Sequence, residues 1–303
     1  MNAFAAAPAT LDRIAPSLPM ARRLRRILFA TDFSRESFNA LPIVGALAKR
    51  YDAHVEVFHA LAPTPIVVPE GATYTPVAAI EAEQKIHEVL KADVLDGRHV
   101  SWAVRLGLAA ETIMDEAVDQ KADLIVLGTH GYSGLRHFLM GSVCEELARS
   151  APCPVLTVGP HVDKRFANPE RTTRILVPVD FTPESLEVVP SVLSLASDFD
   201  TCVTFLHVRK ETSSGLPSSR AKHFVGMMRR MFQHHVPDRC TTRYLVEDGD
   251  PASTILAVAY ETFADVIAMG VRAKKDVPFQ LRSSVTYRVI AGAQCPVLIS
   301  HLH

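Results

Sequence analysis

A run of widely spaced small residues carries the most suggestive chemistry in this sequence. Gly128, Gly131 and the pair Gly141-Ser142 are separated by two and by nine residues. Glycine has no Cβ, so it lets backbone N–H groups approach an anion closely and tolerates positive φ. The pair opens a segment with helical spacing, and the first turn of a helix adds unpaired N–H groups and the positive end of the helix dipole. We therefore expect a phosphate chain to bind here, with the Ser142 hydroxyl as a further donor.

The elements that position this loop follow from the apolar pattern. A continuous apolar run precedes Gly128, as expected for a parallel strand that is buried on both faces. Similar runs alternate with helical stretches, which predicts a parallel sheet with right-handed crossovers. Asp32 and Gly128 each follow a strand, and ligands of such sheets bind beyond the carboxyl ends of the strands. We expect strands over residues 27–31, 54–60, 100–106, 123–127 and 154–158, and helices over 77–95 and 110–118.

Two residues define the helix that follows the first strand. Ser34 is a favourable N-cap ahead of an apolar stripe that begins at Leu41. Pro42 falls inside this stripe and has no backbone N–H to donate, so we expect either a kink or a later start of the helix.

The second half of the chain repeats the first. The segment RRILFATDFSRES matches TRILVPVDFTPES, so Asp32 corresponds to Asp180, 148 residues later. Gly128 corresponds to Gly270, 142 residues later. Six residues are therefore missing from the second copy between its second and third strands, and the chain is expected to contain two similar domains.

The spacing G-x2-G-x9-G-[S/T], with the strand before it and the Cys-Pro-Val-Leu segment after it, resembles the ATP-binding universal stress proteins. The resemblance implies an α/β fold with two tandem doubly wound parallel sheets. Each would have five strands in the order 3-2-1-4-5, as in adenine nucleotide α-hydrolase-like proteins. We expect an N-terminal tail at residues 1–21, a first domain that binds ATP at 22–160, a linker at 161–171 and a second domain with a degenerate site at 172–303.

The resemblance also implies a nucleotide site in the first domain, occupied by ATP with Mg²⁺. Asp32 would lie on the ribose or metal side, Ala60 would offer its backbone to adenine, and Ala30 would line the base pocket. These alanines replace a larger aliphatic residue and a proline that are common in the family, which loosens the expected recognition of the base. The implied contacts are Ala30, Thr31, Asp32, Ala60, Gly128, Thr129, His130, Gly131, Gly134, Gly141, Ser142 and Val143.

The equivalent loop of the second copy has lost most of its glycines. The corresponding positions are Gly270, Ala273, Ser283 and Ser284. Alanine does not easily adopt positive φ, and a serine side chain fills space that a phosphate would need. The loop also gains lysines and arginines, but solvated charges contribute little individually. We expect the second domain to bind ATP weakly or not at all.

Composition excludes several other classes of protein. The 303 residues carry a formal net charge of −1, which does not suggest a nucleic-acid binder or a membrane-surface protein. Five cysteines, an odd number, do not make a disulfide framework, so we expect a reduced, cytoplasmic setting and no metal site. Cys144 lies near a predicted helix N-terminus, where we expect a lowered thiol pKa. His59 and His207 correspond in the two copies, which favours a shared packing or hydrogen-bonding role over catalysis.

The leading hypothesis is a cytoplasmic regulatory protein of the stress response. ATP would order the loop between Gly128 and Gly141, and an unidentified protein partner or the second domain would read the change. The apolar last strands at 154–158 and 296–300 need cover, so we expect pairing of the two domains or a homodimer. The alternatives are a slow ATPase or phosphoryl-transfer enzyme and a nucleotide-free interaction scaffold. The chain has no Walker lysine and no recognisable nucleophile and base, so we expect no catalytic residues and at most weak hydrolysis.

Overall fold

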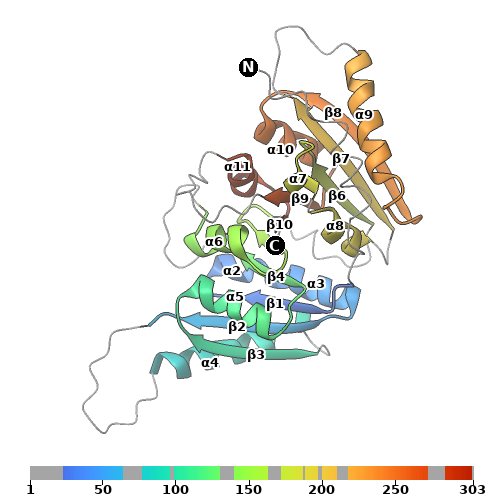
Figure 1. Cartoon of the computed structure of the whole chain (residues 1–303). Coiled ribbons are helices and arrows are strands. Elements are labelled where there is room, and N and C mark those ends of the chain that lie inside the picture. Colours follow the sequence, from blue (N-terminus) through green and yellow to red (C-terminus); the bar gives the residue numbers. More distant parts are fainter. Residues whose placement is uncertain are drawn as a thin grey trace. The chain divides into compact units, whose positions relative to one another are not determined.

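The contacts within the chain divide it into two compact units. One is Leu24–Glu170, which we call the first repeat, and the other contains Arg171–His303, which we call the second repeat. The molecule is described by a computed structural model (Figure 1). The residues described are 23–63, 77–95, 99–129, 140–162, 172–186, 188–196, 200–209, 218–271 and 284–301. Among them, no helix combines the length and the apolar character needed to cross a membrane.

The first repeat is built on a parallel sheet with the strand order β3-β2-β1-β4-β5. This is the predicted order 3-2-1-4-5. The central strand β1 pairs with both β2 and β4, so that Phe29 lies beside Val57 on one side and Val126 on the other. Burial on both faces explains why β1 and β4 are continuous apolar runs. The strands are β1 Arg26–Ala30, β2 His54–Leu61, β3 Val100–Leu106, β4 Leu124–Gly128 and β5 Val155–Val158.

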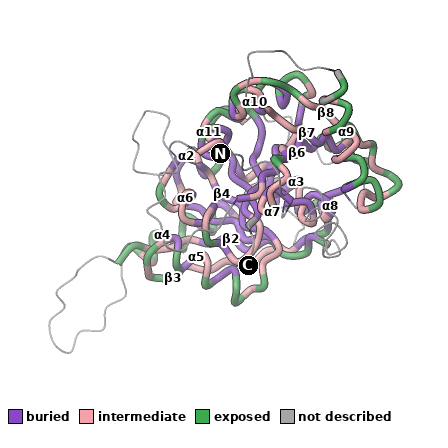
Figure 2. Tube along the Cα trace, turned by 45° about the horizontal axis from the view of Figure 1, so that its top comes forward, coloured by how far each residue is buried: buried purple, intermediate pink, exposed green. Residues whose placement is uncertain are grey.

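Helices pack against this sheet, and their inner faces are buried (Figure 2). Helix α4 packs on β2 and β3, α5 packs on β2 and α6, and α3 packs on β1 and β2. The N-termini of α5 and α6 follow the carboxyl ends of β3 and β4, which places both helix starts at one edge of the sheet. The helices are α2 Arg35–Phe38, α3 Leu41–Tyr51, α4 Val77–Leu90, α5 Ala109–Asp119 and α6 Ser142–Ser150.

The expectations for Ser34 and Pro42 are confirmed. The Ser37 backbone N–H donates to the Ser34 hydroxyl oxygen at 3.1 Å, which caps α2. The chain then begins a new helix, α3, with Pro42 in its first turn, where a missing N–H costs nothing.

The predicted helix over 77–95 is too long. Helix α4 ends at Leu90, and a 3₁₀ helix, η2 Asp93–Leu95, follows. The backbone N–H of Leu95 donates to the Ala92 carbonyl at 2.9 Å. This tighter turn carries the Leu95 side chain into the core, where it is 2% exposed, and burial of that side chain outweighs continuation of the α-helix.

The second repeat has the same topology, with the strand order β10-β9-β6-β7-β8. Its central strand β6 pairs with β7 and β9, as β1 pairs with β2 and β4. The strands are β6 Thr173–Pro178, β7 Thr201–Arg209, β8 Cys240–Asp248, β9 Val266–Val271 and β10 Val297–His301. The helices are α7 Pro183–Leu186, α8 Val189–Ala196, α9 Ser218–Phe232, α10 Pro251–Glu261 and α11 Val285–Gly292.

The repeat extends to individual hydrogen bonds in the turn after the first strand. In the first repeat the Ser34 hydroxyl donates to Asp32 Oδ1 at 2.6 Å, and in the second the Thr182 hydroxyl donates to Asp180 Oδ1 at 2.6 Å. Between the members of each pair lies a phenylalanine in the left-handed region, with φ values of 61° and 62°. Such a conformation is rare for a bulky residue, so its recurrence shows that the two turns are built in the same way.

Close packing explains the glycine at the end of the fourth strand of each repeat. A Cβ on Gly128 would lie 3.0 Å from the Ser37 Cα in α2. A Cβ on Gly270 would overlap the Glu184 carbonyl oxygen and lie 3.0 Å from the Ser185 Cα in α7. The short helix after the first strand therefore rests directly on this glycine. This need is independent of any ligand, which explains why Gly270 persists in the second repeat.

We predict that Gly270→Ala lowers the free energy of unfolding by about 1–3 kcal/mol, since backbone atoms of α7 must move. Chemical denaturation of the full chain, followed by circular dichroism, measures the loss. Gly226→Ala in α9 is the control, because its Cβ would meet only the Arg230 guanidinium at 3.6 Å. Alanine is also the better helix former, so this variant should be as stable as the parent or more stable. Equal stability of the Gly270→Ala variant and the parent would contradict the packing argument.

Candidate functional site

A cavity of about 190 Å³ lies in the first repeat, beyond the carboxyl ends of β1, β2 and β4 and beside the N-terminus of α6. Nine of the twelve residues predicted from the sequence line it, namely Ala30, Thr31, Asp32, Ala60, Gly128, Thr129, Gly141, Ser142 and Val143. The other three, His130, Gly131 and Gly134, lie outside the described residues. The fold thus brings four separate segments of the chain to one hollow.

Asp32 has a fixed orientation on the wall of this cavity. Its Oδ1 accepts hydrogen bonds from the Ser34 backbone N–H at 3.0 Å and from the Ser34 hydroxyl at 2.6 Å. These bonds hold the carboxylate at the end of β1, next to the close contact between α2 and Gly128. A carboxylate held in this way can accept a hydrogen bond from a sugar hydroxyl or bind a divalent cation.

Two buried threonines make the strand ends polar. Thr31 is 5% exposed and Thr129 is 2% exposed, and both line the cavity. The Thr31 hydroxyl lies 2.9 Å from the Ser37 hydroxyl and accepts the Phe33 backbone N–H at 3.0 Å. These contacts fix the floor of the cavity where the chain leaves β1.

The two ends of the glycine loop are joined by a backbone hydrogen bond. The Gly141 N–H donates to the Thr129 carbonyl at 2.8 Å, and the Thr129 N–H donates to the Val158 carbonyl of β5 at 3.0 Å. The loop therefore starts and ends at the edge of the sheet. The Gly141 N–H is used by this bond, so the donors left for an anion at this end are those of the first turn of α6.

The N-terminus of α6 is open to a ligand. Its N-cap residue, Gly141, has φ −63° and ψ 149° and provides no side-chain cap. Ser142 is exposed, and both it and Val143 lie on the cavity wall. The first N–H groups of a helix need a partner from outside the helix, and an anion can be that partner.

His59, near the end of β2, lines the cavity. Its Nδ1 lies 2.8 Å from the Thr31 carbonyl oxygen, which only accepts, so Nδ1 carries the proton. Burial, with a smaller effect of the nearby Lys85, lowers the pKa of His59. The bond to Thr31 and the nearby Asp32 act in the opposite direction but do not offset this. The ring is therefore neutral at pH 7 and packs 4.4 Å from the Phe33 ring. His207 makes the same bond to the Val179 carbonyl at 2.8 Å, which confirms the shared hydrogen-bonding role.

The sequence was also compared with known protein families. The sequence model of the universal stress protein family matches residues 23–159 and, a second time, residues 171–301. The chain belongs to the universal stress protein family. It is a tandem member, since each repeat matches on its own.

Several individual proteins are similar to this chain. A universal stress protein of Mycolicibacterium smegmatis is 26% identical over 297 residues, which cover 90% of this chain and 96% of that protein. One from Methanocaldococcus jannaschii is 32% identical over 138 residues, covering 44% and 81%. The crystal structure of a universal stress protein from Archaeoglobus fulgidus aligns with a TM-score of 0.68 at 21% identity, covering 92% and 97%, a likeness of fold. A universal stress protein solved in complex with cAMP matches 45% of this chain and 98% of its own, at 23% identity and a TM-score of 0.35.

Seven further residues of this universal stress domain line the cavity and were missed from the sequence. They are Ser37, Phe58, His59, Ala109, Ile113, Leu127 and Cys144. Alternation along β2 could have suggested one of them, since Phe58 lies two residues before Ala60 on the same face of the strand. The contribution of α5 depends on how that helix packs against β2, which no local pattern gives.

The expectation of a lowered pKa at Cys144 is wrong. The side chain is 2% exposed, and burial, with a smaller effect of the nearby Glu145 carboxylate, raises the pKa of the thiol to about 12. A buried thiol loses more from desolvation than it gains from the positive end of the helix. The thiol is therefore protonated at neutral pH, and Cys144 is a small apolar part of the cavity wall.

The same region of the second universal stress domain is less polar. The equivalents of Thr31 and Thr129 are Val179 and Val271, both buried. The hydroxyl of Ser284, which corresponds to Ser142, accepts the Tyr287 backbone N–H at 3.1 Å and so caps α11 from within. Within the described residues, these changes leave fewer polar groups at the strand ends and helix start of the second repeat for a nucleotide to bind.

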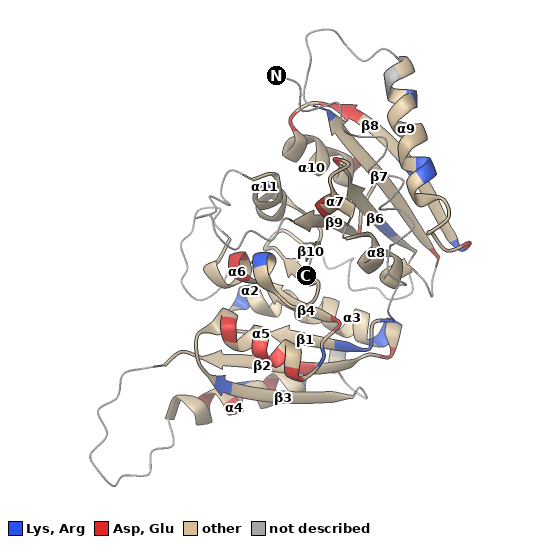
Figure 3. Ribbon diagram, in the orientation of Figure 1, with Lys and Arg blue, Asp and Glu red and all other residues tan. Residues whose placement is uncertain are grey.

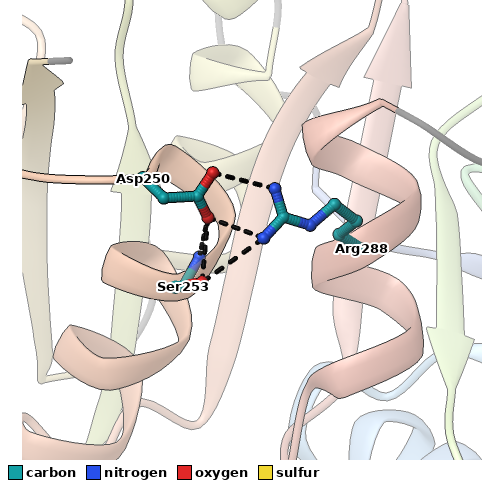
Figure 4. A network of polar contacts seen from close by, with 3 residues as sticks. All are labelled: Asp250, Ser253 and Arg288. Carbon is teal, nitrogen blue, oxygen red and sulfur yellow. Dashed lines mark hydrogen bonds and ion pairs between the residues drawn. The ribbon is translucent and has the colours of Figure 1, made fainter.

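The second domain also joins α10 to α11 by an ion pair (Figure 4). Arg288 donates to both carboxylate oxygens of Asp250 at 2.9 and 2.6 Å, and to the Ser253 hydroxyl at 3.3 Å. The Arg288 guanidinium holds the pKa of the Asp250 carboxyl well below its usual range. The corresponding residues of the first domain are Leu108 and Glu146, which cannot form this pair.

The different caps give a matched prediction for two corresponding serines. We expect Ser284→Ala to lower the free energy of unfolding by about 1 kcal/mol, because α11 loses its N-cap hydrogen bond. Ser142→Ala should change it by less than about 0.5 kcal/mol, because the Ser142 side chain is exposed and does not cap α6. Denaturant unfolding of both variants without nucleotide makes the comparison. Equal losses would show that the two helix starts are built alike.

Proposed function

We propose that this universal stress protein binds ATP with Mg²⁺ in its first repeat and acts as a nucleotide-responsive regulator that a protein partner or the second repeat reads. The observation that carries the proposal is the convergence of nine implied nucleotide contacts on one cavity of the first repeat. Membership of the family supports it, since the pattern G-x2-G-x9-G-S is that of its ATP-binding members.

Each part of the nucleotide has chemically suitable neighbours in this proposal. The phosphates would lie against the first turn of α6, where backbone N–H groups and the Ser142 hydroxyl can donate. The base would lie near the end of β2 against Ala60, with Phe58 and Ile113 as apolar walls. The Asp32 carboxylate would accept a ribose hydroxyl or bind Mg²⁺.

The second repeat is proposed not to bind ATP. It keeps Asp180 and Gly270, but the glycine is explained by its contact with α7, and the aspartate by the turn it caps. Val179 and Val271 remove two hydroxyls from the corresponding strand ends. One nucleotide per chain is therefore the expected stoichiometry.

A regulatory role fits the described residues better than efficient hydrolysis. The Nδ1 atom of His59 is engaged with the Thr31 carbonyl, and Asp32 Oδ1 is engaged with Ser34. Catalysis would need a group that orients an attacking water in line with the leaving phosphate. We therefore assign no catalytic residue.

We predict that ATP with Mg²⁺ binds at one saturable site per chain and that Asp32→Ala weakens it by roughly tenfold or more. A lost hydrogen bond to a charged group costs about 1.5–3 kcal/mol, and each 1.4 kcal/mol is a factor of ten. Isothermal titration of nucleotide-free protein gives the affinity and the stoichiometry. At 100 times the dissociation constant, ATP should add about 2.7 kcal/mol to the stability.

Asp180→Ala is the matched control for this titration. It removes the same turn hydrogen bonds from the second repeat, to Thr182 instead of Ser34, so any general loss of stability is reproduced. We expect its affinity for ATP to be that of the parent. Titration with cAMP and a parallel assay for ADP complete the test. Absence of binding by the parent would refute the proposal, and steady ADP production that Asp32→Ala abolishes would favour an ATPase.

A further inference from the structure

The first repeat buries two acidic side chains side by side. Glu56 on β2 is 5% exposed, and Glu116 on α5 is fully buried. They belong to two elements that pack on each other, α5 and β2, and the charge of Glu116 acts on Glu56. Two ionised carboxylates that are buried near each other repel, and burial disfavours both charges. The folded domain therefore favours the binding of one proton at this position.

The surrounding groups indicate which carboxyl carries the proton. Arg105 on β3 forms an ion pair with Glu116, and Gln120 donates to Glu116 Oε1 at 2.9 Å. Within the described residues, the Oε2 atoms of Glu56 and Glu116 both lack a hydrogen-bond partner, but that of Glu116 faces the Arg105 guanidinium. These neighbours indicate Glu56 as the member that takes the proton.

The other charges near this pair come from two strands and a helix. Arg105 also forms an ion pair with Asp119 of α5 at 3.0 Å, and Arg26 of β1 donates to the Gln120 carbonyl at 2.9 Å. Several residues of α5 are acidic, as the red segments of its ribbon show (Figure 3). Burial, together with the neighbouring Glu116 side chain, raises the pKa of Glu56 to about 7. The charges of Arg105 and Arg26 act in the opposite direction.

The second repeat shows that the fold does not need this pair. The residue that corresponds to Glu56 is Thr204, and the residue that corresponds to Glu116 is Val258. Thr204 lies on β7, the equivalent of β2, and Val258 lies on α10, the equivalent of α5. Burying two carboxyl groups costs desolvation free energy, whereas threonine and valine fill the same positions without a buried charge. Their presence in the first repeat alone points to a role beyond folding.

The pair lies directly behind the cavity. Glu56 is two residues before Phe58 on β2, and Glu116 is three residues, about one helical turn, after Ile113 on α5. Phe58 and Ile113 both line the cavity. Any change in the packing of α5 on β2 therefore moves two walls of the candidate nucleotide site.

We propose that Glu56 and Glu116 form a proton-binding site that couples the packing of α5 on β2, and with it the shape of the cavity, to pH near neutrality. With the proton bound, the two carboxyl groups hold the helix to the strand. When the proton leaves, two buried carboxylates repel each other and α5 moves away from β2. The proton site stands on its own geometry, whereas its effect on a nucleotide rests on the proposed function.

The first test measures the proton itself. In protein labelled with ¹³C at glutamate side chains, one signal that is missing from Glu56→Gln should titrate near pH 7 instead of near 4.5. Glu111→Gln, at an exposed position of α5, is the control and should leave the signal assigned to Glu56 in place. Titration of Glu56 at its ordinary value would overturn the proposal, whether or not any nucleotide binds.

The second test measures stability against pH. The folded state holds the proton more tightly than the unfolded chain, so the stability of the parent should fall as pH rises from 4.5 to about 7 and change little above that. Glu56→Gln keeps a neutral donor to Glu116, so it should lose this slope and have the higher melting temperature at pH 8. The double variant Glu56→Thr, Glu116→Val carries the residues of the second repeat and should also be flat. Parallel profiles for the parent and Glu56→Gln would contradict the proposal.

The third test concerns the nucleotide. Calorimetric titration of ATP at pH 7 in two buffers of different ionisation enthalpy reports the protons taken up on binding. The parent should take up a larger fraction of a proton than Glu56→Gln, and its affinity relative to that variant should fall between pH 6 and pH 8. Comparison with the variant cancels the titration of ATP and of His59. Equal uptake would refute the coupling, while absence of any binding would refute the proposed function and leave the two tests above to decide the proton site.

Discussion

The contact between the helix after the first strand and the glycine at the end of the fourth strand is the constraint on which the rest of this fold depends. Gly128 and Gly270 leave room for backbone atoms of α2 and α7, so the turn after β1 or β6 is pressed against the neighbouring strand end. The aspartate in that turn is then brought beside the start of the glycine loop. A side chain at the glycine would separate the two halves of the cavity wall.

The two repeats show how little of a binding site belongs to the scaffold. They share the strand order, the aspartate turn and a phenylalanine in the left-handed region. They also share a histidine that donates to the carbonyl of the residue before the aspartate. They differ in hydroxyls at two strand ends, in the capping of one helix and in a buried carboxyl pair. The shared features are those that packing requires, and the differences are where ligand chemistry can be gained or lost without refolding the sheet.

Continuous apolar runs and glycine turns are local signals, so the sequence predicted the strands and the position of the cavity, and its resemblance to the universal stress proteins predicted the strand order. It also placed nine residues that meet at the cavity. It failed where distant segments decide the outcome. Cys144 has a raised pKa because the helix that carries it is buried, and the pairing of Glu56 with Glu116 depends on the packing of α5 on β2. Helix α4 ends before the predicted position because the side chain of Leu95 is buried in the core.

The hydrogen bond between the Thr129 carbonyl and the Gly141 N–H has a consequence for evolution of the site. It joins the two ends of the intervening segment at the sheet, so the rest of the folded domain offsets the entropic cost of closing that loop. Doubling the length of a closed loop costs only about 0.6 kcal/mol. Insertions and deletions between these two anchors therefore cost little stability, and the ligand specificity of the first repeat can change while its sheet stays the same.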